Sequence, residues 1–137
     1  MQTGSCQCGG VRYAVDGEFS DVTNCHCNMC QKMHGAAFGT YGEARRDEFS
    51  WTQGDELIVT YESSPGVERR FCKVCGSTLH FQFDQAPDFC YVTLGTIDGN
   101  PGVRPRSHIF VGSKAPWYEI ADDLPQNDEW TPDFQPR

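Results

Sequence analysis

The chain has 137 residues, of which 38% are hydrophobic, and it carries a formal net charge of −8 at neutral pH. This length predicts one domain of ordinary size, and the acidic balance argues against nucleic acid as a partner. We find no apolar stretch of a signal peptide at the N-terminus and no segment of roughly 18 apolar residues that would span a membrane. We therefore expect a cytoplasmic protein, in which metal binding rather than structural disulfides is the leading explanation for the eight cysteines.

Short extended segments rich in β-branched and aromatic residues recur along the chain between turn signals. We expect strands at 11–15, 38–41, 57–62, 78–83, 89–94 and 108–111. The 14 glycines and 8 prolines favour turns over long helices. The pattern therefore predicts a mostly β fold.

One segment, 28–34, invites a helical prediction of about two turns, and it ends at Gly35, which suits a left-handed cap. Further along, residues 58–61 and 68–71 flank Pro65 and Gly66. Proline presets φ and glycine permits a positive φ, so this segment predicts a hairpin whose second arm leads into Cys72.

The last stretch differs from the rest of the chain, and we divide the sequence into a domain at 1–120 and an acidic, proline-rich tail at 121–137. Residues 122–137 hold five acidic residues and three prolines, with Trp130 and Phe134 as the only aromatic residues. One interpretation is a frayed tail. The other is a strap whose two aromatic residues pack on the body or on a second subunit of a homodimer.

Seven of the eight cysteines fall into three short clusters, and this grouping is the strongest signal in the sequence. A C-x-x-C turn lets two sulfurs converge on one ion, and four sulfurs at about 2.3 Å close a tetrahedral zinc site. The two outer pairs are each followed by glycine. We assign them to one closed structural zinc site with the ligands Cys6, Cys8, Cys72 and Cys75.

The central trio, Cys25, Cys27 and Cys30, supplies three ligands and no obvious fourth, which is the arrangement of a catalytic zinc. Alternatively, one further residue completes an ordinary structural site, and the candidates are Cys90, His26, His34 and His108. Cys90 stands in an apolar run and is most simply a buried core thiol. A redox dithiol in the third cluster is disfavoured because the βαβ pattern of such proteins is missing.

Four motifs in register resemble the glutathione-dependent formaldehyde-activating enzyme family. They are SCQCG at 5–9, NCHCNMCQK at 24–32 followed by GAAF at 35–38, FCKVCG at 71–76 and HIFVGSKAPW at 108–117. The resemblance implies several coiled, antiparallel β-sheets around zinc knuckles, with two Zn²⁺ sites of which the second is not always filled. It also implies a carbon-sulfur lyase that joins a small thiol, glutathione, to a small aldehyde, formaldehyde, as S-hydroxymethylglutathione.

The chain departs from the family at Gln31, where many relatives carry a basic residue, and this weakens the case for an anionic thiol. The positions that still offer positive charge are Lys32, Arg104, Arg106 and Lys114.

The resemblance and the open trio together predict a mechanism in which a thiol binds as thiolate and attacks an aldehyde. The resulting alkoxide needs a proton donor. We name His26 and His108 as catalytic candidates, with His34 a further option, although the alternation of a strand turns His26 away from its neighbouring cysteines. Lys114 and Trp117 are the expected substrate contacts. The alternative function is a non-catalytic, zinc-stabilised binding or scaffold domain, and a hydrolase is less favoured because three thiolates make zinc a weak Lewis acid.

Overall fold

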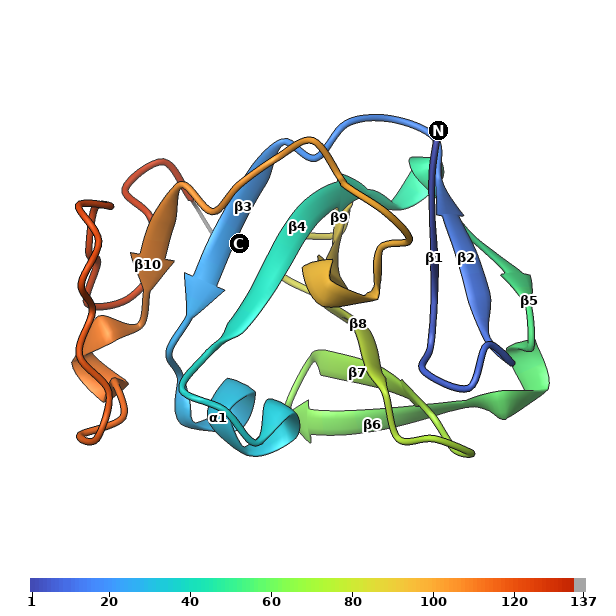
Figure 1. Cartoon of the computed structure of the whole chain (residues 1–137), viewed down its shortest axis with the longest axis horizontal. Coiled ribbons are helices and arrows are strands. Elements are labelled where there is room, and N and C mark those ends of the chain that lie inside the picture. The colour runs from blue at the N-terminus through green and yellow to red at the C-terminus, as the bar shows by residue number, and fades with distance from the viewer. Residues whose placement is uncertain (135–137) are drawn as a thin grey trace.

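A computed structural model describes residues 1–134, which form ten strands, one α-helix and four short 3₁₀ turns in two sheets (Figure 1). In chain order the elements are β1 (Gln2–Ser5), β2 (Arg12–Val15), β3 (Asp21–Cys25), α1 (Asn28–His34), β4 (Gly39–Arg45), β5 (Phe49–Gln53), β6 (Ile58–Ser64), β7 (Val67–Cys72), β8 (Thr78–Phe83), β9 (Phe89–Thr93) and β10 (Ser107–Ile109). None of the helices in this part of the chain is long and apolar enough to cross a bilayer. The mostly β prediction is confirmed.

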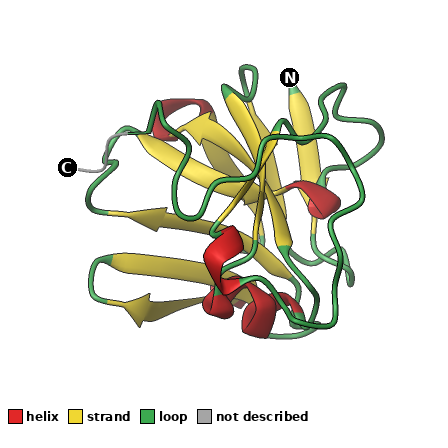
Figure 2. Ribbon diagram, turned by 90° about the vertical axis from the view of Figure 1, so that its left-hand side faces the viewer, coloured by secondary structure: helices red, strands yellow, loops and turns green. Residues whose placement is uncertain are grey.

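The larger sheet has seven strands in the order β10-β3-β4-β9-β8-β7-β6, and the smaller has three in the order β1-β2-β5. All neighbouring strands are antiparallel except β10, which pairs with β3 in parallel. The smaller sheet lies at one side of the molecule and β10 at the other (Figure 1). Figure 1 places α1 at one end of the large sheet, beside the point where β3 ends and β4 begins, and Figure 2 shows how little of the chain is helical beside the strands.

The helix and the hairpin form where the local signals predict them. Cys27 caps α1 by accepting a hydrogen bond from the Cys30 N–H at 3.3 Å, and Gly35 ends the helix with a φ of 58°. β6 and β7 pair antiparallel, and Gly66 takes a φ of 79° in the turn between them. Strands β1, β3 and β5 were not predicted, and β10 ends two residues before the predicted limit.

Two groups of buried side chains make up the core, one on each side of the centre of the large sheet. The first joins the small sheet to β4, β8 and β9 and contains the expected core thiol of Cys90, which is 1% exposed. The second is aromatic and lies between α1, β4, β8, β9 and β10. The first core ties the two sheets together, and the second borders the candidate site.

The C-terminal segment packs on the second core, as the strap interpretation expects. The Trp130 ring stacks on Phe83 at 5.5 Å between centroids and on Phe134 at 4.4 Å. Backbone hydrogen bonds join the segment to β10 and the following turn, among them Phe110 N to Glu129 O at 2.9 Å. Residues 135–137 of the predicted tail lie outside the described residues.

One buried histidine makes the stability of the fold sensitive to acid. His80 on β8 is 3% exposed and packs against the rings of Phe49 and Trp51. Burial, followed by the positive charges of Arg70 and Arg46, lowers the pKa of His80 to about 3. An unfolded histidine titrates near pH 6.5, so between about pH 6.5 and 3 the unfolded chain binds a proton that the folded chain does not. The free energy of unfolding therefore falls as the pH falls through this window.

We expect His80→Gln to be less stable than the parent protein at pH 7.5, because it disturbs a packed site, but to close part of that gap at lower pH. The gain approaches roughly 1.4 kcal/mol for each pH unit below 6. Urea unfolding of both proteins at pH 7.5, 6, 5 and 4.5 measures it. Protonation of the cysteines affects both chains alike and cancels in the difference, so a gap that stays constant with pH would contradict this role of His80.

Candidate functional site

Four sulfurs from distant parts of the chain converge in the first cluster, Cys6, Cys8, Cys72 and Cys75. All four Sγ atoms lie within 4.8 Å of one another, with Cys6 and Cys8 at 3.5 Å and Cys8 and Cys72 at 3.9 Å. Four sulfurs that each lie about 2.3 Å from a tetrahedral ion are about 3.8 Å apart. The spacing and the chemistry of these donors therefore fit a zinc ion.

Local hydrogen bonds favour negative charge on two sulfurs of the first cluster, Cys6 and Cys75. At Cys8 the Gly10 N–H lowers the pKa, but the neighbouring sulfurs and burial outweigh it and raise the pKa to about 11. Gly9 and Gly76 follow the two pairs with φ values of 77° and 78°, a conformation that glycine adopts without strain. Burial opposes ionisation of Cys6, but the Val11 N–H at 3.2 Å and the neighbouring sulfurs lower its pKa overall. The Ser77 hydroxyl lowers the pKa of Cys75 to about 5.

The second cluster joins the end of β3 to the start of α1. The Sγ atoms of Cys25, Cys27 and Cys30 lie within 4.8 Å of one another, and no histidine or carboxylate of the described residues joins them. Hydrogen bonds with Cys27 and Cys30, together with burial, raise the pKa of Cys25. At Cys27, hydrogen bonds with Cys25 and Cys30 outweigh burial and lower the pKa. A divalent cation would let all three ionise, and three protein donors leave one position of a tetrahedral ion for another ligand.

Two further donors reach Cys30 from other strands. The Tyr41 hydroxyl on β4 donates to Cys30 Sγ at 3.5 Å, and both terminal nitrogens of Arg69 on β7 lie 3.8–3.9 Å from the same sulfur. Arg69 is only 3% exposed, and its Nε donates to Ser63 at 3.0 Å. Its guanidinium also lies over the ring of Phe81. A fixed positive charge therefore stands against the trio.

One tautomer of His34 directs the Tyr41 proton at Cys30. The Tyr41 oxygen accepts from Arg69 at 3.4 Å and lies 2.6 Å from His34 Nε2. With the Nε2–H tautomer of His34, both lone pairs of the hydroxyl are occupied, so its own proton is directed at Cys30. The close approach of His34 to β4 depends on Gly39, because a Cβ there would lie 2.5 Å from the imidazole.

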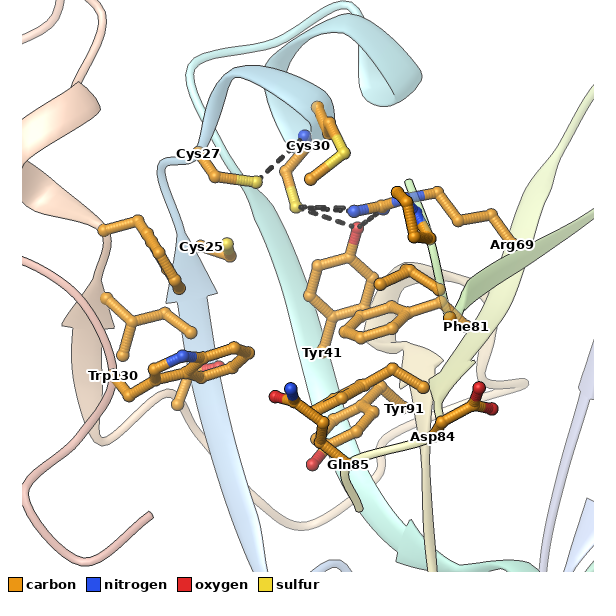
Figure 3. A pocket seen from close by; sticks show the side chains of 18 residues that line it. Cys25, Cys27, Cys30, Tyr41, Arg69, Phe81, Asp84, Gln85, Tyr91 and Trp130 are labelled. Carbon is orange, nitrogen blue, oxygen red and sulfur yellow. Dashed lines mark hydrogen bonds between the residues drawn. The ribbon is translucent and has the colours of Figure 1, made fainter. Parts of the chain in front are cut away.

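A cavity of about 500 Å³ opens directly on the trio (Figure 3). The cysteines, Tyr41 and Arg69 lie at one end of it, and Asp84 and Gln85, both exposed, lie at the other. Aromatic and aliphatic side chains supply most of the wall between these ends. They are Met29, Val67, Phe81, Phe83, Tyr91, Ile109, Phe110 and Trp130.

Four of the predicted site residues lie away from this cavity. His26 is fully buried, and its Nε2 lies 2.8 Å from His108 Nδ1. His108 Nε2 in turn lies 3.0 Å from the Asp122 carboxylate, so this pair of histidines fastens the C-terminal segment. Lys114 donates to the backbone oxygens of Ala115 and Tyr118, and Trp117 is 71% exposed. None of the four lines the cavity, and their functional roles stay predictions.

Sequence reasoning missed Arg69 and Tyr41, because neither belongs to a motif and both stand within segments that are predicted simply as strands. The structure also shows the surroundings of Gln31 and of the third cysteine cluster. Gln31 donates to the backbone oxygens of His26 and Ser113, tying α1 to the turn after β10. No helix follows Cys75, where β8 begins at Thr78, so the context of a redox dithiol is absent from the described chain.

Comparison with known proteins gives concordant matches. The family described as glutathione-dependent formaldehyde-activating enzyme matches residues 1–113. A protein of Halomonas elongata, provisionally named as such an enzyme, is 31% identical over 128 residues, which cover 85% of this chain and 79% of that protein. A Schizosaccharomyces pombe protein named as an uncharacterised lyase is 24% identical over 119 residues, 87% of this chain and 85% of its own. The crystal structure of a Rhodobacter sphaeroides protein has a TM-score of 0.63 at 26% identity, over 76% of this chain and 92% of that one.

We expect Cys8→Ser to lose one zinc ion per chain and to lower the melting temperature by roughly 10 °C or more, because a structural zinc site supplies folding energy. Cys8 is exposed, so an ordinary substitution there would change stability by only about 0.5 kcal/mol. Elemental analysis and thermal unfolding of the purified proteins measure both effects.

The matched control is Cys90→Ala, which removes a buried thiol outside both clusters. It should lose stability through packing while its zinc content stays at the parent value. If Cys8→Ser kept both its metal and its melting temperature, the first cluster would not be a metal site.

Proposed function

Because the chain belongs to the glutathione-dependent formaldehyde-activating enzyme family, we propose that it is an enzyme that makes and breaks the carbon-sulfur bond of thiol-aldehyde adducts. One observation carries the proposal: the cavity opens directly on the sulfurs of Cys25, Cys27 and Cys30. A scaffold domain needs the metal clusters but not this cavity. The family name supplies glutathione and formaldehyde as the first pair to assay.

The reaction is an addition without any redox change. The thiol sulfur forms a bond to the carbonyl carbon, the carbon-oxygen double bond becomes a single bond, and the proton that leaves sulfur ends on oxygen. The product is a hemithioacetal, and the lyase direction reverses each step. The enzyme therefore has to hold an ionised sulfur, orient the aldehyde and supply hydrogen bonds to the developing alkoxide.

The cysteines fit two zinc ions, with Cys6, Cys8, Cys72 and Cys75 as ligands of one and Cys25, Cys27 and Cys30 as ligands of the other. When bound beside the cavity, zinc lowers the pKa of a thiol ligand and so supplies a thiolate nucleophile near neutral pH. None of the eight cysteines forms a disulfide, and we propose a reducing compartment such as the cytoplasm as the place of the reaction.

Tyr41 and Arg69 are our candidates for stabilising the alkoxide. Burial, and then the charge of Cys30, raises the pKa of Tyr41 well above its ordinary value, so the hydroxyl keeps its proton at neutral pH. Burial disfavours the charge of Arg69, but Cys30 and Tyr41 more than offset this and raise its pKa. Both groups point at the cysteine end of the cavity, where an adduct oxygen would lie (Figure 3). His34 supports them by holding the Tyr41 oxygen.

His26 and His108 take a different role in this proposal. His26, the residue after β3, lies beside Phe38 and Tyr118, and His108 joins it to Asp122. Burial, followed by the charge of His108, lowers the pKa of His26 to about 4, so it is neutral at physiological pH. We propose that the two histidines position β3, β10 and the C-terminal segment rather than contact the reacting atoms.

We expect Tyr41→Phe to lower kcat for adduct formation by about 100-fold, because it removes one hydrogen bond to the alkoxide and leaves the ring in place. The rate of exchange between free and sulfur-bound aldehyde carbon, followed by NMR, measures this against the uncatalysed background. Zinc content should not change, since the hydroxyl is not a metal ligand.

Tyr13→Phe provides the matched control. Its hydroxyl bonds to Thr96 at 2.6 Å within the first core, away from the cavity, so the variant should lose about 1 kcal/mol of stability and keep its rate. A Tyr41→Phe protein that retained more than a third of the parent rate would exclude the hydroxyl from the reaction.

A further inference from the structure

We propose that the substrate of this cavity carries a neutral apolar group, preferably an aromatic ring, and that the site selects against an anionic peptide thiol such as glutathione. The reaction in which such a substrate takes part rests on the proposed function. The selectivity rests on the walls and charges of the cavity, which stand independently of the reaction.

The walls beyond the cysteines are apolar and largely aromatic. Phe81 and Tyr91 stack at 4.6 Å between centroids on neighbouring strands, and Phe83 stacks on Tyr91 at 5.5 Å. Trp130 and Phe110 face one another edge to face at 5.0 Å and form another part of the wall. Burial of an apolar substituent against such surfaces is favourable, whereas burial of a charge without a partner is costly.

Positive charge is available at only one point of the described lining. Arg69 is the sole lysine or arginine among these residues, and its nitrogens already contact Ser63, Tyr41 and Cys30 at the reactive end. The exposed Asp84 lies at the opposite end of the cavity (Figure 3). A carboxylate that extends from a thiol bound at the trio would therefore meet a negative charge at the mouth.

The other cations that the sequence offered lie elsewhere. Lys32 borders a separate depression with Tyr61 and Ser63, and Lys114 is bonded to backbone oxygens. Arg104 and Arg106 border a third hollow near Phe19 and Asn100. None of these four lines the cavity beside the trio.

Size does not distinguish the two kinds of substrate, because a cavity of about 500 Å³ is within the ordinary range for small ligands of either kind. The charge of the ligand does distinguish them. Glutathione carries two carboxylates and one ammonium group. Arg69 is the one cation of the described lining and already contacts Ser63, Tyr41 and Cys30, so at least one carboxylate would lose water in this cavity without gaining a cation. A neutral aromatic thiol has no such penalty and gains the aromatic walls.

Part of this wall belongs to the C-terminal segment, outside residues 1–113 of the family match. The segment is held by paired backbone hydrogen bonds, from Val111 N to Asn127 O at 3.0 Å and from Asn127 N to His108 O at 3.0 Å. Phe110 takes a φ of 55°, which is uncommon for a residue with a side chain and which places its ring against Trp130. The chain thus holds two apolar rings over the cavity at some cost in backbone strain.

A matched set of probes tests the proposal on the full-length, zinc-loaded protein by isothermal titration calorimetry. Benzyl mercaptan and 4-(mercaptomethyl)benzoic acid have the same ring and thiol and differ by one carboxylate, and glutathione is the third probe. We expect benzyl mercaptan to bind at least tenfold more tightly than either acid.

Three variants locate the effect. Trp130→Ala should weaken benzyl mercaptan about tenfold and leave glutathione within twofold. Asp84→Lys, an exposed change that does not depend on core packing, should tighten both acids at least threefold and leave benzyl mercaptan unchanged. Trp117→Ala tests the residue that the sequence favoured, and it should change none of the three because Trp117 does not line the cavity.

Glutathione binding as tight as that of benzyl mercaptan would overturn the proposal. It would also be overturned if benzyl mercaptan lost its affinity for Trp117→Ala and kept it for Trp130→Ala.

The exchange NMR assay with the same three thiols and formaldehyde tests the selectivity separately from the reaction. Selective binding of the aromatic thiol without any catalysed exchange would contradict the proposed function alone. Catalysed exchange fastest with glutathione would contradict the selectivity alone.

Discussion

Three thiol groups crowded within 4.8 Å cannot all ionise unless positive charge lies beside them, and the arrangement around Cys25, Cys27 and Cys30 answers this constraint. A divalent cation together with the Arg69 guanidinium would balance three thiolates. Removing an arginine from water is costly, which accounts for the contacts of Arg69 with Ser63, Tyr41 and Cys30. The sheet also serves this charge balance. Strand β7, which carries Arg69, is separated from β3 by β4, β9 and β8 in the sheet order, and the fold still brings Arg69 to the cysteine trio.

The first cluster meets a different need. It joins the turn after β1 to the end of β7, segments more than 60 residues apart in sequence, and so connects the small sheet to the far side of the large one. The metal ligands proposed there would restrict the unfolded chain as a cross-link does. Because this cross-link fixes the end of β7, it also fixes the strand that carries Arg69. The structural cluster therefore supports the geometry of the trio without contacting it.

The features predicted correctly from the sequence are those with local signals. They include the cap at Gly35, the turn at Pro65 and Gly66 and the turns that bring neighbouring cysteines together. Each of these depends on a few neighbouring residues. Strand β1 was missed because QTGS has a single β-branched residue and no aromatic one, so pairing with β2 makes it extended. Strands β3 and β5 were missed although DVTNC and FSWTQ contain strand-forming residues. Tyr41 and Arg69 are 28 residues apart and meet Cys30 only through the sheet order, which no local pattern encodes.

The histidines show why residue type is a weaker guide than position. His26 and His108 are chemically suited to proton transfer, and that role stays a prediction. His26, the residue directly after β3, bonds to His108 and does not line the cavity that its neighbours Cys25 and Cys27 border. The C-terminal segment shows the converse. Its acidic, proline-rich composition resembles that of a disordered tail, but its acidic residues stay in solvent while Trp130 faces the cavity. The reactive end of the site thus lies within the part of the chain shared with the family, and Trp130, from a segment outside that part, completes the wall that would recognise the substituent.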